Sequence, residues 1–171
     1  MTSEEALIGR IAGRLLAGPD EPGAEGELRP DWMPELPFDR PPVPAAVLIA
    51  LIRRTAGLSV LYTERSTDLR SHSGQISFPG GRIDPTDAGA ADAALREAGE
   101  EVAMDRNEAR VLGYMPRYFT GTNYLITPVV AVVEPSRPFV ANPTEVRSVF
   151  EVPLEQLMRD ESYGTFRIRR G

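Results

Sequence analysis

A cluster of glutamates near the end of an expected helix constrains this chain more than any other feature. Residues 80–104 read GGRIDPTDAGAADAALREAGEEVAM, and their spacing predicts a helix that begins near Asp87. Small and apolar residues recur three and four positions apart and form one stripe: Ala91, Ala94, Leu95, Ala98 and Val102. We expect Glu97, Glu100 and Glu101 on the opposite side of this helix, with Glu97 and Glu101 one turn apart.

Three carboxylates in this position destabilise a bare helix. Like charges one turn apart cost about 0.2–0.5 kcal/mol per pair. Anions near the C-terminus oppose the helix dipole by about 0.3–1 kcal/mol. A hard divalent cation would replace this repulsion by ligation, because carboxylate oxygens are the ligands that Mg²⁺ takes. The alternative is a solvated acidic face, and the helix by itself does not decide between the two.

The helix and the loop before it resemble the Nudix box. Its pattern is Gly, five residues, Glu, seven residues, and then Arg-Glu-apolar-x-Glu-Glu-x-Gly-apolar. The residues that match are Gly81, Arg96, Glu97, Glu100, Glu101 and Met104. Three features depart from the pattern: the first acid is Asp87, eight residues separate it from Arg96, and Ala103 replaces the last glycine. The longer spacing is expected in the coenzyme A branch of the family. We expect Ala103 to alter only the exit of the helix, where glycine supplies a left-handed cap.

The segment before the box resembles the longer motif of Nudix coenzyme A pyrophosphatases, L-x-T-x-R-S-x-x-L-R-x-H-x-G-Q-apolar-x-F-P-G-G. Every fixed position is present: Leu61, Thr63, Arg65, Ser66, Leu69, Arg70, His72, Gly74, Gln75, Phe78, Pro79, Gly80 and Gly81. The resemblance covers roughly residues 41–170. It implies an α/β protein with the Nudix fold, in which a mixed β-sheet is sandwiched between α-helices (α/β/α).

The same resemblance implies a function. The expected reaction is metal-dependent hydrolysis of the diphosphate bond of coenzyme A or acyl-CoA, with Mg²⁺ or Mn²⁺ as cofactor. The products would be 3′,5′-ADP and 4′-phosphopantetheine or its acyl form. Two alternatives stay open: a Nudix pyrophosphatase for another nucleoside diphosphate derivative such as ADP-ribose or NADH, and a Nudix-fold binding module without turnover. The three intact glutamates argue against the second alternative, whereas Ala103 keeps it open.

The box also implies roles for individual residues. The expected metal ligands are Glu97, Glu100 and Glu101. The expected catalytic residues are Glu100, Glu101 and Arg96 from the box, and Glu145 from a loop that the family resemblance also covers. Arg96 either binds a phosphate or pairs with a glutamate and orients it, and we favour the second interpretation because Arg96 lies away from Glu101. Asp87 is either a metal ligand or the N-cap of the helix, and the cap is favoured. Glu145 is a candidate general base, with an exposed acid as the alternative.

Substrate contacts are expected in the segment that leads into the box. The resemblance assigns these residues to the nucleotide and its phosphates, without individual contacts: Arg65, Arg70, His72, Gln75, Gly80 and Gly81. Gly80 and Gly81 are interpreted as a sharp turn, where glycine accepts a positive φ and allows a ligand to approach closely; their carbonyls could also reach the metal. Arg70 is the first candidate to bind a 3′-phosphate, because arginine offers a forked pair of donors.

Composition excludes several other kinds of site. The chain has no cysteine and a single histidine, His72, which excludes disulfides, thiolate zinc sites, cysteine nucleophiles and a multi-histidine metal cage. The net charge of −6 argues against non-specific nucleic-acid binding. All 19 basic residues are arginines, which suit phosphate recognition, although a G+C-rich genome produces the same bias.

No apolar run reaches the length of a membrane span. The first residues, MTSEEAL, are acidic where a signal peptide would be basic. We therefore expect a cytoplasmic protein with a small-molecule substrate, no nucleic-acid or membrane partner, and a possible homodimer.

Residues 1–43 are predicted to form an N-terminal helix and a proline-rich connector, and residues 44–171 the Nudix domain. Ser3 is the expected cap of the first helix, and Gly18 and Pro19 are expected to end it. Further strands are expected over 45–52, 58–63, 75–78, 110–115, 124–133 and 163–169, with another strand after the loop 142–146. A loop is expected over 118–123 and a short helix over 153–158. The family usually continues with another strand and a closing helix, so at Gly171 either this member is short or its C-terminal end is truncated.

Overall fold

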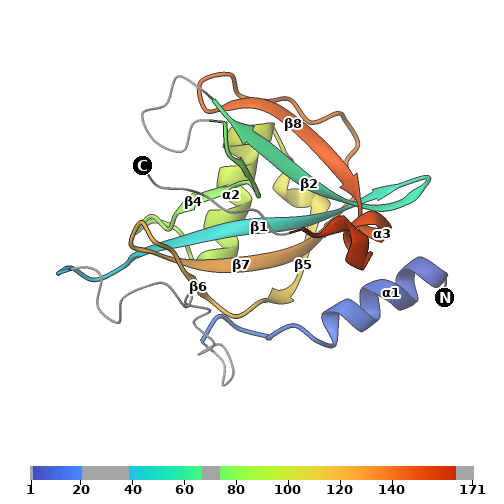
Figure 1. The fold of residues 1–171 in the computed structure, drawn as a ribbon, viewed down its shortest axis with the longest axis horizontal. Coiled ribbons are helices and arrows are strands. Elements are labelled where there is room, and N and C mark those ends of the chain that lie inside the picture. The colour runs from blue at the N-terminus through green and yellow to red at the C-terminus, as the bar shows by residue number, and fades with distance from the viewer. Residues whose placement is uncertain (1, 21–38, 67–73, 165–171) are drawn as a thin grey trace.

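A long central strand, β1 (Val43–Arg54), organises the mixed sheet of this protein (Figure 1). In the computed structural model, which describes residues 2–20, 39–66 and 74–164, β1 pairs in parallel with β7 (Tyr124–Val133) along its length. β2 (Gly57–Arg65) pairs antiparallel with the end of β1, and β4 (Gly80–Arg82) pairs antiparallel with its beginning. The continuous apolar run of β1 suits this position, because a strand with both faces covered has no polar side.

The remaining strands extend the sheet on either side of this centre. β5 (Ala109–Tyr114) and β6 (Tyr118–Phe119) pair with β7, whereas β3 (Ile76–Ser77) and β8 (Val146–Pro153) pair with β2. Within the described residues the sheet has eight strands, and its main path runs β3-β2-β1-β7-β5. Short 3₁₀ helices lie at Arg106–Glu108 and Asp160–Ser162.

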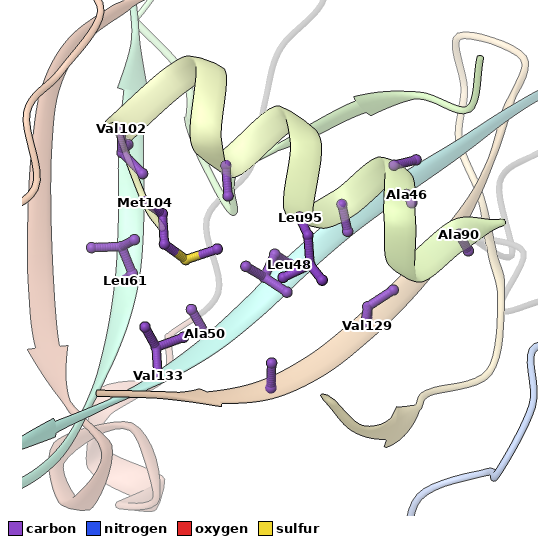
Figure 2. Close-up of a cluster of buried hydrophobic side chains, with 14 of the residues drawn as sticks. Ala46, Leu48, Ala50, Leu61, Ala90, Leu95, Val102, Met104, Val129 and Val133 are labelled. Carbon is purple, nitrogen blue, oxygen red and sulfur yellow. The ribbon is translucent and has the colours of Figure 1, made fainter. Parts of the chain in front are cut away.

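Helices cover the two faces of the sheet. α2 (Ala90–Val102) packs on one face, where its alanines and Leu95 meet Leu48 and Leu61 in a fully apolar core (Figure 2). α1 (Ser3–Ala12) and α3 (Leu154–Leu157) pack on the other face, against a second apolar cluster that includes Val60 and Val132. This arrangement confirms the expected α/β/α layering of helices and a mixed sheet.

The first helix differs from its prediction at both ends. Its N-cap is Thr2 and not Ser3, because the Thr2 hydroxyl accepts the N–H of Glu5 at 3.2 Å. The helix ends at Ala12, and the chain then turns so that Leu16 exchanges two backbone hydrogen bonds of 2.9 Å with Tyr114. The segment after α1 therefore adds a β-bridge to the edge of β5 instead of another helical turn.

Two strands were not expected. The predicted loop 118–123 begins with β6, and the predicted turn at Gly80 and Gly81 is the strand β4. Tyr163 and Gly164 are not in a strand, and the rest of the strand predicted over 163–169 lies outside the described residues.

The central helix begins later than predicted, at Ala90. Gly89 is the N-cap with a φ of 147°, so the prediction that Asp87 caps the helix is wrong. Asp92 supports this start, because its carboxylate accepts the N–H of Ala88 at 3.0 Å.

The position predicted for Glu101 also needs correction. Seven residues make almost two full turns, so Glu101 lies close to Ala94 at the border of the buried face and not opposite to it.

Ala103 ends α2 in the left-handed conformation, with φ 55° and ψ 34°. This conformation costs a residue with a Cβ about 1–2 kcal/mol. Ala103 is exposed, so its methyl group contributes little packing. We expect Ala103→Gly to raise the free energy of unfolding by about 0.5–1 kcal/mol, after the greater chain entropy of glycine is subtracted. Urea denaturation measures this change, and Ala91→Gly inside the same helix, which should destabilise, is the control. A lower stability of Ala103→Gly would contradict the prediction.

Candidate active site

A cavity of about 420 Å³ opens where β1, β4, β7 and the C-terminal half of α2 meet. Six of the residues predicted from the sequence line it: Arg65, Gly80, Gly81, Glu97, Glu101 and Glu145. Six further lining residues were not predicted: Ala45, Ala46, Val47, Arg82, Tyr124 and Ile126. Residues from six separate parts of the chain therefore converge on one polar cavity.

Glu101 is the most deeply buried carboxylate of this cavity, with an exposed fraction of 5%. The backbone N–H of Gly80 donates to its carboxylate. Its Oε2 atom is buried and has no hydrogen-bond partner among the described residues. Burial, together with the charge of Glu97, raises the pKa of Glu101 to about 7. A buried carboxylate oxygen without a partner is costly, and a cation in the cavity would satisfy it.

Glu97 lies one helical turn before Glu101 and faces the same cavity. Burial raises the pKa of Glu97, and this effect is opposed by Arg96, whose Nη1 donates to the carboxylate at 3.1 Å. Glu97 also lies directly against Gly81, since a Cβ at position 81 would be 2.3 Å from its Oε1 atom. The carboxylate thus occupies the space that a side chain on β4 would need.

Gly80 and Gly81 have a different role from the one predicted. Neither has a positive φ, so the interpretation as a sharp left-handed turn is wrong. Both are extended residues of β4, and the requirement for glycine is spatial. A Cβ on Gly80 would lie 2.3 Å from the carbonyl oxygen of Ala46. The two glycines therefore allow β4 to approach both the central strand and the carboxylates.

Arg96 holds the loop before α2 against the helix. Its guanidinium donates to both carboxylate oxygens of Asp87, at 2.9 and 3.0 Å, to Glu97 at 3.1 Å and to Glu100 at 3.1 Å. It also donates to the carbonyl of Arg82 at 3.1 Å. This geometry matches the second interpretation of Arg96, in which it orients a glutamate. The bidentate contact with Arg96 also holds the pKa of the Asp87 carboxyl below its usual range.

The other predicted carboxylates differ in their position. Glu100 is half exposed, bonds to Arg96 and does not line the cavity, so its predicted role as a ligand stays a prediction. Glu145 does line the cavity, and its charge contributes to the raised pKa values of Glu97 and Glu101. Its carbonyl accepts the N–H of Ser66 at 2.9 Å. Glu145 therefore shares the cavity with the two helix carboxylates.

The predicted substrate residues are only partly brought together. Arg65 lines the cavity, its Nε is buried without a partner among the described residues, and its charge partly offsets the raised pKa of Glu101. Gln75 is exposed and does not line the cavity, although its carbonyl accepts the N–H of Arg65 at 2.9 Å. Arg70 and His72 lie outside the described residues.

Glu97 and Glu101 fit a hard divalent cation. Both are oxygen donors, both have raised pKa values, and one Glu101 oxygen lacks a partner among the described residues. Across the described ranges, no group of three or more acidic residues or histidines converges closely enough to hold an ion by itself. An ion held by Glu97 and Glu101 would therefore keep positions for water or for phosphate oxygens, which is typical of Mg²⁺.

The raised pKa of Glu101 predicts a pH-dependent stability without metal. Because the folded pKa of about 7 lies above the ordinary 4.5, the stabilising contribution is complete below pH 4.5 and is lost as the pH rises to 7. We expect the free energy of unfolding in EDTA to fall by about 2–3 kcal/mol across this window. Mg²⁺ should restore it above pH 7, since it favours the ionised carboxylate. Urea denaturation between pH 5 and 8, with EDTA or Mg²⁺, measures both effects, and a flat profile in EDTA would contradict them.

Comparison with known proteins identifies the family. The NUDIX domain model matches residues 42–168, so the chain belongs to the Nudix family. The Nudix hydrolase NudL of Escherichia coli strain K12 is 47% identical over 128 residues, which is 74% of this chain and 66% of that protein. NudL of Shigella boydii serotype 18 is 46% identical over the same length. The matched part of the chain spans slightly less than two thirds of the length of these relatives.

Solved structures show the same fold at low sequence identity. The Nudix hydrolase RenU of M. smegmatis superposes with a TM-score of 0.57 and 20% identity, over 69% of this chain and 74% of that one. An Ap4A hydrolase of C. elegans gives a TM-score of 0.55 at 17% identity, over 71% of this chain and 87% of that one. The NUDIX domain of Shewanella oneidensis NrtR, complexed with ADP ribose, gives 0.52 at 19% identity, over 75% of this chain and 82% of that one.

The lining residues that sequence reasoning missed come from strand pairing. Arg82 and Tyr124 belong to β4 and β7, which lie on either side of β1. Their separation along the chain gives no sign of this proximity. The only sign of the role of Arg82 in the sequence was its position directly after Gly81.

No helix in the described part of the chain has the length and apolarity needed to cross a membrane.

Proposed function

We propose that this protein hydrolyses the diphosphate bond of coenzyme A or acyl-CoA. The observation that carries this proposal is the sharing of one cavity by two motifs. Arg65 comes from the segment that resembles coenzyme A pyrophosphatases, and Glu97 and Glu101 come from the Nudix box. The guanidinium of Arg65 beside the two carboxylates suits a diphosphate substrate with a bound metal ion. Arg65 can bind the phosphates, and Glu97 and Glu101 can bind the metal.

The proposed chemistry assigns a task to each group. A Mg²⁺ or Mn²⁺ ion held by Glu97 and Glu101, with Glu100 as a further ligand, would neutralise the diphosphate and improve the leaving group. Arg65 would hold a phosphate oxygen by charge-assisted hydrogen bonds. Glu145 would accept the proton of the attacking water. Arg96 would keep Glu97 in place through the hydrogen bond of 3.1 Å.

A second candidate function has support from the fold neighbours. One neighbour is described as an Ap4A hydrolase and another as a domain complexed with ADP ribose. Substrates of these kinds also carry phosphate chains that a metal and Arg65 could bind. A pyrophosphatase for ADP-ribose, NADH or a dinucleotide is therefore the alternative, and a binding module without turnover is the third possibility.

A direct assay separates these functions. The purified protein is incubated with coenzyme A, 3′-dephospho-coenzyme A, ADP-ribose or NADH in Mg²⁺ or Mn²⁺, and the products are identified by mass. We expect 3′,5′-ADP and 4′-phosphopantetheine from coenzyme A, with activity abolished by EDTA. In ¹⁸O-labelled water, the product that carries the label identifies the attacked phosphorus. Faster cleavage of ADP-ribose or NADH than of coenzyme A would favour the alternative, and no cleavage at all would favour a binding module.

The proposal also concerns the cellular location and the oligomeric state of the protein. A cytoplasmic location and a homodimer stay predictions. Fractionation of the source cells measures the first, and sedimentation equilibrium measures the second.

A further inference from the structure

Arg82 lies on the wall of the cavity but faces away from the glutamates. In β4, Gly81 pairs with Ala46 and lies against Glu97, whereas Arg82 pairs with Ala45. Since successive residues of a strand point to opposite faces, the side chain of Arg82 leaves on the face opposite to α2. The residues that line the cavity come from both faces of the sheet, because they include Glu97 and Glu101 on one face and Arg82 on the other.

Tyr124 holds the guanidinium of Arg82 in place across the beginning of β1. The Tyr124 hydroxyl accepts hydrogen bonds from Nε and Nη2 of Arg82, at 3.2 and 3.1 Å. The guanidinium carbon also lies 5.7 Å from the centre of the tyrosine ring. Both residues line the cavity. Arginine has five N–H donors, so most of them stay available to a ligand.

The partner of Arg82 differs in charge from the partners of other arginines in this structure. Arg53, Arg54 and Arg96 each bind carboxylates, which neutralise them. Among the described residues, no carboxylate forms an ion pair with Arg82, and the partner that positions it is a neutral hydroxyl. A guanidinium oriented by a neutral group keeps its full charge for an incoming anion, with less side-chain entropy to lose on binding.

We propose that Arg82, positioned by Tyr124, binds a phosphate monoester of the substrate that is separate from the hydrolysed diphosphate. This inference rests on the proposed function, because coenzyme A carries a 3′-phosphate on the ribose that also bears the diphosphate. Gly80, which donates to Glu101, is two residues from Arg82, or about 7 Å along an extended strand. Two phosphate groups on one ribose can span such a distance with the help of the long arginine side chain.

The proposal predicts selectivity for the extra phosphate. A charge-assisted hydrogen bond of this kind changes affinity by about 10- to 100-fold. We expect Arg82→Gln to lower kcat/KM for coenzyme A by this factor and to change that for 3′-dephospho-coenzyme A less than about threefold. The loss should lie mainly in KM, because the phosphate contact exists before the reaction and persists through it.

Two further variants test the roles of charge and positioning. Arg82→Lys keeps the charge without the fork, so it should retain part of the preference for coenzyme A. Tyr124→Phe removes only the hydroxyl that orients the guanidinium, so it should weaken the preference by a smaller factor than Arg82→Gln. Arg159→Gln is the matched control, because Arg159 is an exposed arginine just after α3 that pairs with Glu155. It should leave kcat/KM for both substrates unchanged.

The outcomes separate this inference from the proposed function. Equal losses on both substrates, or no loss on coenzyme A, would overturn the role of Arg82. If the wild-type protein cleaves neither substrate, the proposed function fails, and calorimetric binding of 3′,5′-ADP and 5′-AMP then decides the inference. A preference for 3′,5′-ADP that disappears in Arg82→Gln supports the subsite, and a ratio that Arg82→Gln does not change overturns it.

Discussion

Replacing Glu101 by glutamine is expected to abolish most of the activity while making the metal-free protein more stable. The carboxylate is 5% exposed, lies beside Glu97 and has an unpartnered oxygen among the described residues. Glutamine keeps the shape and removes the charge that would bind the cation. We expect kcat to fall by about two to three orders of magnitude, the size typical of the loss of one preorganised electrostatic contact.

The stability of this variant should change in the opposite direction. At pH 8 the wild-type protein holds a buried, ionised Glu101, and its raised pKa corresponds to a penalty of about 3 kcal/mol. Glutamine removes this penalty but must find partners for its amide, so we expect a gain of about 1–2 kcal/mol in EDTA. Mg²⁺ should stabilise the wild-type protein and have little effect on the variant.

Two matched variants make this test specific. Glu155→Gln, at an exposed residue of α3, should change neither activity nor stability. Glu100→Gln, on the same helix as Glu101 but bonded to Arg96, should lose less activity than Glu101→Gln. Full activity of Glu101→Gln with saturating metal would rule out the proposed role of this carboxylate. A loss in Glu100→Gln as large as that in Glu101→Gln would show that Glu100 is as important for holding the ion as Glu101.

The sequence predicts the main elements of this fold well where burial dictates the pattern. β1 and β7 are apolar on both faces, and α2 has a stripe of alanines with Leu95, so their positions were predictable within a few residues. The ends of the helices were not predictable from capping residues alone. Thr2 and Ser3 are both residue types that cap helices, so the sequence does not distinguish them at the start of α1. Asp87 is also a suitable capping residue for α2, but in the structure its carboxylate binds Arg96.

The candidate site was predictable where one motif contains it. Glu97 and Glu101 are one turn apart on one helix, so their proximity follows from local geometry. The closeness of Tyr124 to Arg82 depends instead on the register of three strands. Val43 of β1 pairs with Tyr124, and Ala45 of β1 pairs with Arg82. A single sequence does not encode register in a readable form, because many apolar pairings satisfy the same alternation.

The two adjacent glycines of β4 should respond very differently to the same substitution. A Cβ on Gly80 would lie 2.3 Å from the carbonyl oxygen of Ala46 and 2.7 Å from the Cα of Val47, which are backbone atoms of the central strand. Backbone atoms of β1 cannot move without disturbing its pairing with β7, so we expect Gly80→Ala to destabilise the protein by about 3 kcal/mol. Thermal or urea denaturation measures this loss.

Gly81→Ala should instead leave the fold largely intact and damage the site. The atoms nearest to its Cβ belong to the Glu97 carboxylate, at 2.3, 2.5 and 2.8 Å, and this is the flexible end of a side chain. The carboxylate would have to move away from β4 and therefore from its position beside Glu101. We expect a destabilisation below about 1 kcal/mol but a loss of about 100-fold in kcat, because a small displacement of a catalytic group has such an effect.

A double-mutant cycle tests this mechanism directly. Glu97→Asp shortens the side chain by one methylene group and should itself lower activity, because its carboxylate no longer reaches the same place. In the double variant Gly81→Ala/Glu97→Asp, the shorter side chain leaves room for the new methyl group. The double variant should therefore be more active than the product of the two single losses, which indicates coupling between the two positions. Strictly additive losses would show that Gly81 does not act through Glu97. A Gly81→Ala protein as unstable as Gly80→Ala would show that the methyl group displaces the strand and not the carboxylate.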